Sequence, residues 1–172
     1  MIRHVIAFLL TISCFVAAAQ HKAVDPTEEF AIKGAVKHEL HLSIKDLLQF
    51  RQDTLLNVVF RDKGGKAKGT GRDMKGVLLR TVLDSAHVEA KDHKVLNELC
   101  IVLSASDGYK NVYSWNELFN TSIGDSVYII TEIAHKPVQD MEDRILVVSL
   151  GDKTSGRRHL KALEGIVIKS VN

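Results

Sequence analysis

The sequence RILVVSLGDKTSGRRHLKALEGIVI, residues 144–168, contains the pattern that decides the fold. Its apolar run at 145–150 predicts a buried strand, because short apolar runs bounded by turn residues are typical of strands. Residues 166–168, Ile-Val-Ile, predict a second short strand. The loop between them, residues 153–159, is basic and contains glycine, so its donors and cations suit an anionic ligand such as a phosphate. The alternative interpretation is a solvated basic turn that binds nothing.

The first nineteen residues have the pattern of a secretory signal peptide (residues 1–19). Arg3 precedes an apolar core too short to span a bilayer, and an alanine run permits cleavage after Ala19. A lipid anchor on Cys14 is the alternative. We therefore expect a secreted or periplasmic protein with a flexible lead at residues 20–28.

Composition limits the classes of function. The chain has 172 residues, with 23 Lys and Arg against 21 Asp and Glu, and removal of the signal peptide takes away one of these cations. A nearly neutral chain argues against a general nucleic-acid binder, which needs an excess of cations to release counterions. About 150 mature residues are enough for one domain with a real core, which we place at residues 29–172. The sequence has no hydrophobic segment of transmembrane length after the signal, and Cys100 alone remains, so no intramolecular disulfide is expected.

Short strands alternate irregularly with a few short helices. Because there is no regular βαβ repeat, the pattern predicts an α+β fold of mixed, layered small β-sheets. Capping patterns begin two of the helices, one with Ser43 and one with Ser114 and Glu117. The expected strands lie at 30–36, 39–42, 55–60, 99–103, 112–113, 126–134, 145–150 and 166–168, and the expected helices at 44–50, 76–86 and just after Ser114.

No catalytic or metal-binding motif is present in the sequence. The glycine-rich and basic segment at 61–73 has threonine where a phosphate-binding P-loop needs lysine. His38 and His41 are three residues apart on an expected strand, whereas a zinc-binding HExxH motif needs four-residue spacing on a helix. Cys100 lies within an apolar strand, where a free cysteine behaves as a small hydrophobic residue. We therefore assign no catalytic residue and no metal ligand.

Five segments, taken in order, resemble the molybdopterin-binding domain of the sulfite oxidase-like oxidoreductases. The resemblance spans residue 30 to the C-terminus, and it implies a mixed α+β fold with a cleft for the pterin and its phosphate. The segments are FAIKGAV (30–36), LSIKDL (42–47), KGVLLRTVL (75–83), SDGY (106–109) and residues 146–168.

The resemblance also implies which residues hold the cofactor. The turn after the fourth strand borders the cleft, the loop at 153–159 faces the pterin phosphate, and the segment at 61–73 flanks the metal centre. The implied cofactor-binding residues are Arg61, Arg72, Asp107, Gly108, Tyr109, Lys153, Gly156, Arg157, Arg158 and His159.

The sequence departs from the family at the metal ligand. Family enzymes bind molybdenum through a cysteine after the strand that corresponds to 55–60, but residues 59–62 here are Val-Phe-Arg-Asp. We therefore expect a domain that binds molybdopterin, another pterin or a small anion without oxo transfer. The alternatives are a molybdenum-dependent oxidoreductase with a non-cysteine ligand and a non-catalytic scaffold that binds a protein partner.

Overall fold

The computed structural model describes residues 23–171, so the predicted signal peptide lies outside the described residues. No helix in this part of the chain is long and apolar enough to cross a membrane. The elements in chain order are β1 (Glu29–Gly34), β2 (Leu40–Ser43), α1 (Ile44–Leu47), β3 (Asp53–Val58), β4 (Arg72–Leu78), α2 (Leu79–Ser85), α3 (His93–Leu96), β5 (Leu99–Ala105), β6 (Lys110–Ser114), α4 (Trp115–Phe119), η1 (Gly124–Ser126), β7 (Val127–Ile133), β8 (Lys136–Pro137), η2 (Val138–Asp140), β9 (Leu146–Ser149), η3 (Ser155–Arg158) and β10 (Leu163–Ser170).

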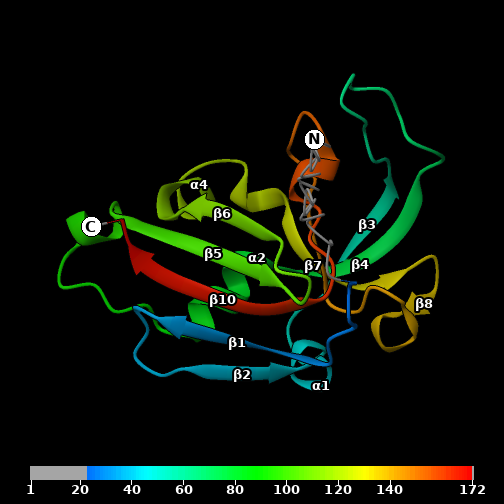
Figure 1. The fold of residues 1–172 in the computed structure, drawn as a ribbon. Helices are drawn as coiled ribbons and strands as arrows, with labels where there is room; N and C mark the ends of the chain where they lie inside the picture. Colours follow the sequence, from blue (N-terminus) through cyan, green and yellow to red (C-terminus); the bar gives the residue numbers. More distant parts are fainter. Residues whose placement is uncertain (1–22, 172) are drawn as a thin grey trace, which may run out of the picture.

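Two five-stranded sheets form the framework of the fold (Figure 1). The first sheet has the order β2-β1-β10-β5-β6, and the second has the order β3-β4-β7-β8 with β9 paired to β7. The pairing of β1 with β10 is parallel and the other strand pairings are antiparallel. The predicted α+β fold of small mixed sheets with short helices is therefore confirmed. Strands make up most of its regular secondary structure.

The core consists of two clusters of buried side chains. The larger one joins the inner face of the first sheet to α2, which lies behind that sheet in Figure 1. The smaller one packs β4, β7 and β9 against η2. Ile44, the first residue of α1, contacts both clusters and so connects the two sheets.

The predicted helix at 76–86 is wrong in its first turn. β4 continues to Leu78, and α2 begins only at Leu79. Gly76 and Val77 pair with β7, and a Cβ on Gly76 would lie 2.9 Å from the carbonyl oxygen of Ile129. A short apolar run has no clear period of its own, so the neighbouring strand decides its conformation.

The helix predicted at 44–50 is also shorter than expected. Ser43 caps α1 as predicted, with its side chain accepting the amide of Asp46 in a capping box. Leu48, which lies within the predicted range, is past the end of the helix and is 43% exposed. The carboxylate of Asp46 bonds back to Ser43, which lowers the pKa of Asp46.

Candidate functional site

Three connections that are far apart in the sequence meet at one end of the molecule. They are the β3–β4 loop (residues 59–71), the β5–β6 turn (106–109) and the β9–β10 connection (150–162), which contains η3. Ser106 donates its amide to the carbonyl of Ala162, which ties the turn to the last connection. The sequence-predicted site residues other than Arg72 lie on these three connections.

The β3–β4 loop packs against η3. The amide of Arg61 donates to the buried Ser155 hydroxyl at 2.7 Å, and the rings of Phe60 and His159 stack with their centroids 5.2 Å apart. The Arg61 guanidinium turns back on its own loop and donates to the Gly65 carbonyl at 3.0 Å. These contacts hold the start of the β3–β4 loop against the segment that carries Ser155 and His159.

The β5–β6 turn also contacts η3. Gly108 has a φ of +87°, which favours glycine, and the amide of Tyr109 donates to the Asp107 carboxylate at 2.8 Å. The Tyr109 hydroxyl donates to the Arg157 carbonyl at 2.6 Å, while the residue as a whole stays 45% exposed. An exposed aromatic ring therefore lies against the segment that carries Arg157.

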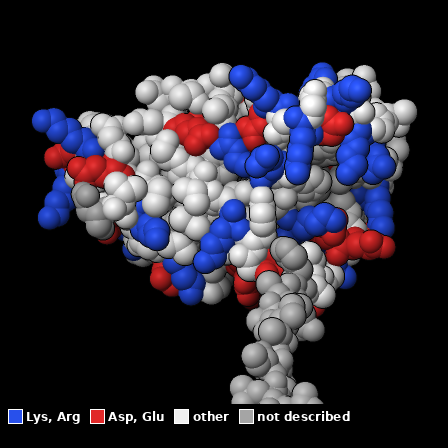
Figure 2. All heavy atoms as spheres, turned by 45° about the horizontal axis from the view of Figure 1, so that its top comes forward, with Lys and Arg blue, Asp and Glu red and all other residues white. Residues whose placement is uncertain are grey.

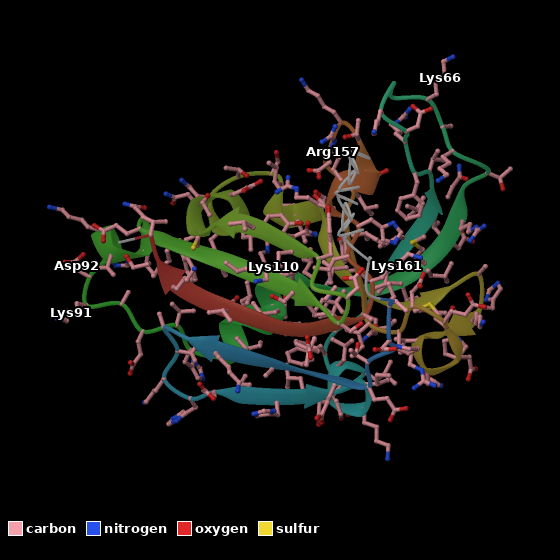
Figure 3. The ribbon with its side chains drawn as sticks, in the orientation of Figure 1. Lys66, Lys91, Asp92, Lys110, Arg157 and Lys161 are labelled. Atoms are coloured by element: carbon pink, nitrogen blue, oxygen red, sulfur yellow. The ribbon has the colours of Figure 1, made fainter. Side chains whose placement is uncertain are left out.

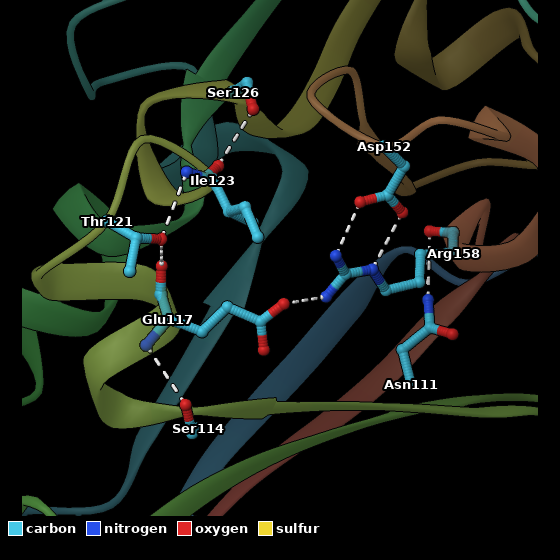
Figure 4. A network of polar contacts seen from close by, with 8 residues as sticks. All are labelled: Asn111, Ser114, Glu117, Thr121, Ile123, Ser126, Asp152 and Arg158. Atoms are coloured by element: carbon cyan, nitrogen blue, oxygen red, sulfur yellow. Dashed lines mark hydrogen bonds and ion pairs between the residues drawn. The ribbon is translucent and has the colours of Figure 1, made fainter.

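Arg158 points into the protein and is held by two carboxylates (Figure 4). Its Nε and one terminal nitrogen donate to both oxygens of Asp152, at 2.8 and 2.5 Å, and its other terminal nitrogen donates to Glu117 at 2.5 Å. The guanidinium carbon lies 4.4 Å from the centroid of the Tyr113 ring, and the Arg158 side chain is 20% exposed. The bonds to Asp152 raise the pKa of Arg158, and burial raises the pKa of Tyr113 to about 12.

Sequence reasoning missed the partners of Arg158. Glu117 fitted a capping box, and its amide does donate to the Ser114 hydroxyl at 3.1 Å. Its carboxylate does not bond back to the Ser114 amide as in a full capping box. It pairs instead with Arg158, which lies 41 residues later in the sequence. No local spacing predicts such a contact, so neither Glu117 nor Asp152 entered the predicted site.

Cations are concentrated on the β3–β4 loop and the β9–β10 connection. Residues 61–73 contain five basic and two acidic side chains, and residues 152–161 contain four and one, which gives these two segments a net +6 against +2 for the whole chain. Figure 2 shows Lys and Arg side chains gathered on one half of the face toward which these loops point. On the β3–β4 loop (59–71) and the β9–β10 connection (150–162), the exposed cations that form no ion pair with any described residue are named the basic face: Arg61, Lys63, Lys66, Lys68, Lys153 and Arg157. Figure 3 shows Lys66 and Arg157 both pointing away from the body of the protein.

The remaining predicted residues take different positions. Gly156 is exposed with open space where a Cβ would lie. Arg72 begins β4 and lines a separate cavity of about 420 Å³ with Lys136 and Glu142. The other nine predicted residues line none of the five cavities described within residues 23–171. The basic face therefore borders none of these five cavities.

Comparison with known proteins relates the fold to that of a solved structure. No protein-family model matches the sequence, and neither does any curated protein sequence. Among solved structures, the sulfane dehydrogenase SoxCD from Paracoccus pantotrophus matches with a TM-score of 0.60 and 16% identity, over 83% of this chain. The chain shares the fold of the matched part of the SoxCD chain. The predicted resemblance to the sulfite oxidase-like molybdopterin domain is therefore confirmed at the level of the fold, and the chain spans 39% of the SoxCD chain.

The described residues do not fit a molybdenum centre with a thiolate ligand. The β3–β4 loop contains no cysteine. Cys100 lies near the start of β5, and at about 3.3 Å per residue it is about 17 Å along the strand from Ala105, where the β5–β6 turn begins. Within residues 23–171, no three His, Cys, Asp or Glu side chains are grouped to hold a metal ion. The exposed cations of the basic face, in contrast, can form charge-assisted pairs with an anion.

Proposed function

We propose that this chain is a binding domain that holds a phosphate-bearing ligand, such as a pterin phosphate, on its basic face without oxo transfer. The observation that carries the proposal is the hydrogen bond from the Tyr109 hydroxyl to the Arg157 carbonyl. This bond keeps an exposed aromatic ring next to a segment whose arginine side chain is exposed and forms no ion pair with the described residues.

Each part of this arrangement suits one part of such a ligand. Arg157 can make a bidentate, charge-assisted pair with a phosphate, and Lys153 adds a second cation on the same connection. The ring of Tyr109 offers a face on which a flat heterocycle can stack. The lysines of the β3–β4 loop add positive potential, which attracts the anion from a distance.

The test is a titration with a metal-free pterin monophosphate, followed by pterin fluorescence. We expect the protein to bind this probe more tightly than the unphosphorylated pterin, and Arg157→Ala to weaken binding by about tenfold or more, as expected for loss of a charge-assisted hydrogen bond. Arg51→Ala is the matched control, because Arg51 is an exposed arginine whose partner, Asp53, lies outside the basic face.

Two results would contradict the proposal. One is equal affinity of the wild-type protein and Arg157→Ala for the phosphorylated probe. The other is no binding of any pterin or of inorganic phosphate, which would favour the alternative of a scaffold that binds a protein partner.

A further inference from the structure

We propose that Arg158 is a positioning residue of the binding loop and not a ligand contact. Together with Glu117 and Asp152, it holds η3 in the conformation that presents Arg157 and Tyr109 to the ligand. The part of this inference that concerns the ligand rests on the proposed function, whereas the part that concerns the loop does not.

The contacts of Arg158 connect three parts of the molecule. Asp152 precedes η3 on the same connection, Glu117 belongs to α4, and Tyr113 beneath the guanidinium belongs to β6. A planar fork that donates to two carboxylates at once allows little rotation of the side chain. Arg158 thereby fastens the end of η3 to α4 and β6.

The main chain of the same turn is held as well. The carbonyl of Arg158 accepts the side-chain amide of Asn111 at 3.0 Å, and the carbonyl of Arg157 accepts the Tyr109 hydroxyl. Asn111 is 4% exposed, so this first bond is shielded from water. Backbone and side-chain contacts at two successive residues therefore fix the direction in which Arg157 leaves the turn.

Charge explains why Arg158 itself does not take the ligand. Its one positive charge faces the two negative charges of Glu117 and Asp152, so the cluster has a net charge of −1. An approaching anion would be repelled by both carboxylates, and it would meet a guanidinium that already uses three of its five N–H donors on Asp152 and Glu117. Arg157, the residue before it, is exposed and has no carboxylate partner among the described residues.

A loop that is held before binding improves affinity, because fewer side chains and backbone torsions have to be ordered by the ligand. Loosening the cluster should therefore weaken binding although every ligand contact is still present. This separates a positioning residue from a contact residue in an experiment.

The experiment measures amide hydrogen exchange at residues 153–159 and affinity for the pterin monophosphate in three variants. Glu117→Gln removes a charge and Arg158→Lys removes the planar fork, and both nearly keep the size of the side chain. In both variants we expect about tenfold faster amide exchange at residues 153–159, with exchange in β5 and β10 unchanged. We also expect both to bind the pterin monophosphate more weakly. Arg157→Ala is the control, and it should lose affinity while its loop exchange stays at the wild-type rate.

The outcomes decide the two proposals separately. Wild-type exchange rates in both Glu117→Gln and Arg158→Lys would overturn the positioning role. If Arg158→Lys also lost affinity at a wild-type exchange rate, Arg158 would be a ligand contact. If the wild-type protein binds no probe, the proposed function fails and the exchange rates alone decide the inference. The triple variant Glu117→Gln, Asp152→Asn, Arg158→Met leaves no buried charge unpaired, so it should fold and should also show fast exchange if the inference is right.

Discussion

The half-buried ring of His159 stacks on Phe60 at the junction of the two basic connections, and its Nε2 has no hydrogen-bond partner among the described residues. Burial is the main cause that lowers the pKa of His159, and Lys161 and Lys68 lower it further. The folded protein therefore keeps this imidazole neutral at pH values where the unfolded chain is already protonated.

This shift makes stability dependent on pH. As the pH falls from the ordinary histidine pKa of about 6.5 to the lower pKa of folded His159, the unfolded chain binds the extra proton and the free energy of unfolding falls. We expect His159→Phe, which can keep the stack, to lose less stability than wild type between pH 7.5 and pH 5 in urea titrations. His38→Gln, at an exposed histidine, is the control. Parallel pH curves for His159→Phe and wild type would refute the prediction.

Neighbouring arginines should respond differently to the same substitution. Arg158→Ala leaves Asp152 and Glu117 partly buried without their cation. We expect it to lower the free energy of unfolding by about 1–3 kcal/mol, a range reduced because solvent reaches all three side chains. Arg157→Ala should change it by less than about 0.5 kcal/mol. The difference follows from the ion pairs, which only Arg158 makes with described residues. Equal midpoints of urea unfolding would show that the cluster adds no stability.

At the scale of elements, close backbone approach decides where glycine is required. Gly34 ends β1 with a φ of +100°, and a Cβ there would lie 2.0 Å from the Ile168 carbonyl oxygen of β10. Gly156 in η3 has no such neighbour, although it lies in the predicted ligand loop. Of these two glycines, the fold therefore requires Gly34 in the first sheet and not Gly156 in the predicted ligand loop.

Alanine substitution tests this contrast. We expect Gly34→Ala to lower the free energy of unfolding by more than about 2 kcal/mol. The alanine would strain the positive φ at this residue, and its Cβ would push β1 away from β10. Gly156→Ala should be neutral or raise it by up to about 1 kcal/mol by restricting the unfolded chain. Thermal unfolding of the two variants compares them directly, and a similar loss in both would contradict the account of Gly34.

At the scale of the whole molecule, charge is segregated although the total is small. The two basic segments have a net +6, so the rest of the chain has a net −4 to reach the total of +2. A field of this kind steers anions toward one end of the protein. The overall composition does not reveal it, because tertiary structure brings residues 61–73 and 152–161 together.

Metal content tests the function of the whole chain. We expect protein purified from a host that makes molybdenum cofactor to contain no stoichiometric molybdenum, because the β3–β4 loop lacks a thiolate and Cys100 lies toward the far end of β5. The positive control is a sulfane dehydrogenase produced in the same host. Stoichiometric molybdenum with turnover of a sulfur substrate would revive the alternative of an oxidoreductase with a non-cysteine ligand.

Local patterns in the sequence determined most strands, the Ser43 cap, the fold class and the two basic loops, because alternation, capping and turn residues act over a few positions. Tertiary structure decided that residues 76–78 form a strand, since β7 supplies the hydrogen bonds. It also decided that Arg158 turns inward while Arg157 stays outside, because the carboxylate of Glu117 comes from α4, 41 residues earlier. Both decisions depend on partners distant in sequence, whose identity only the packed chain reveals.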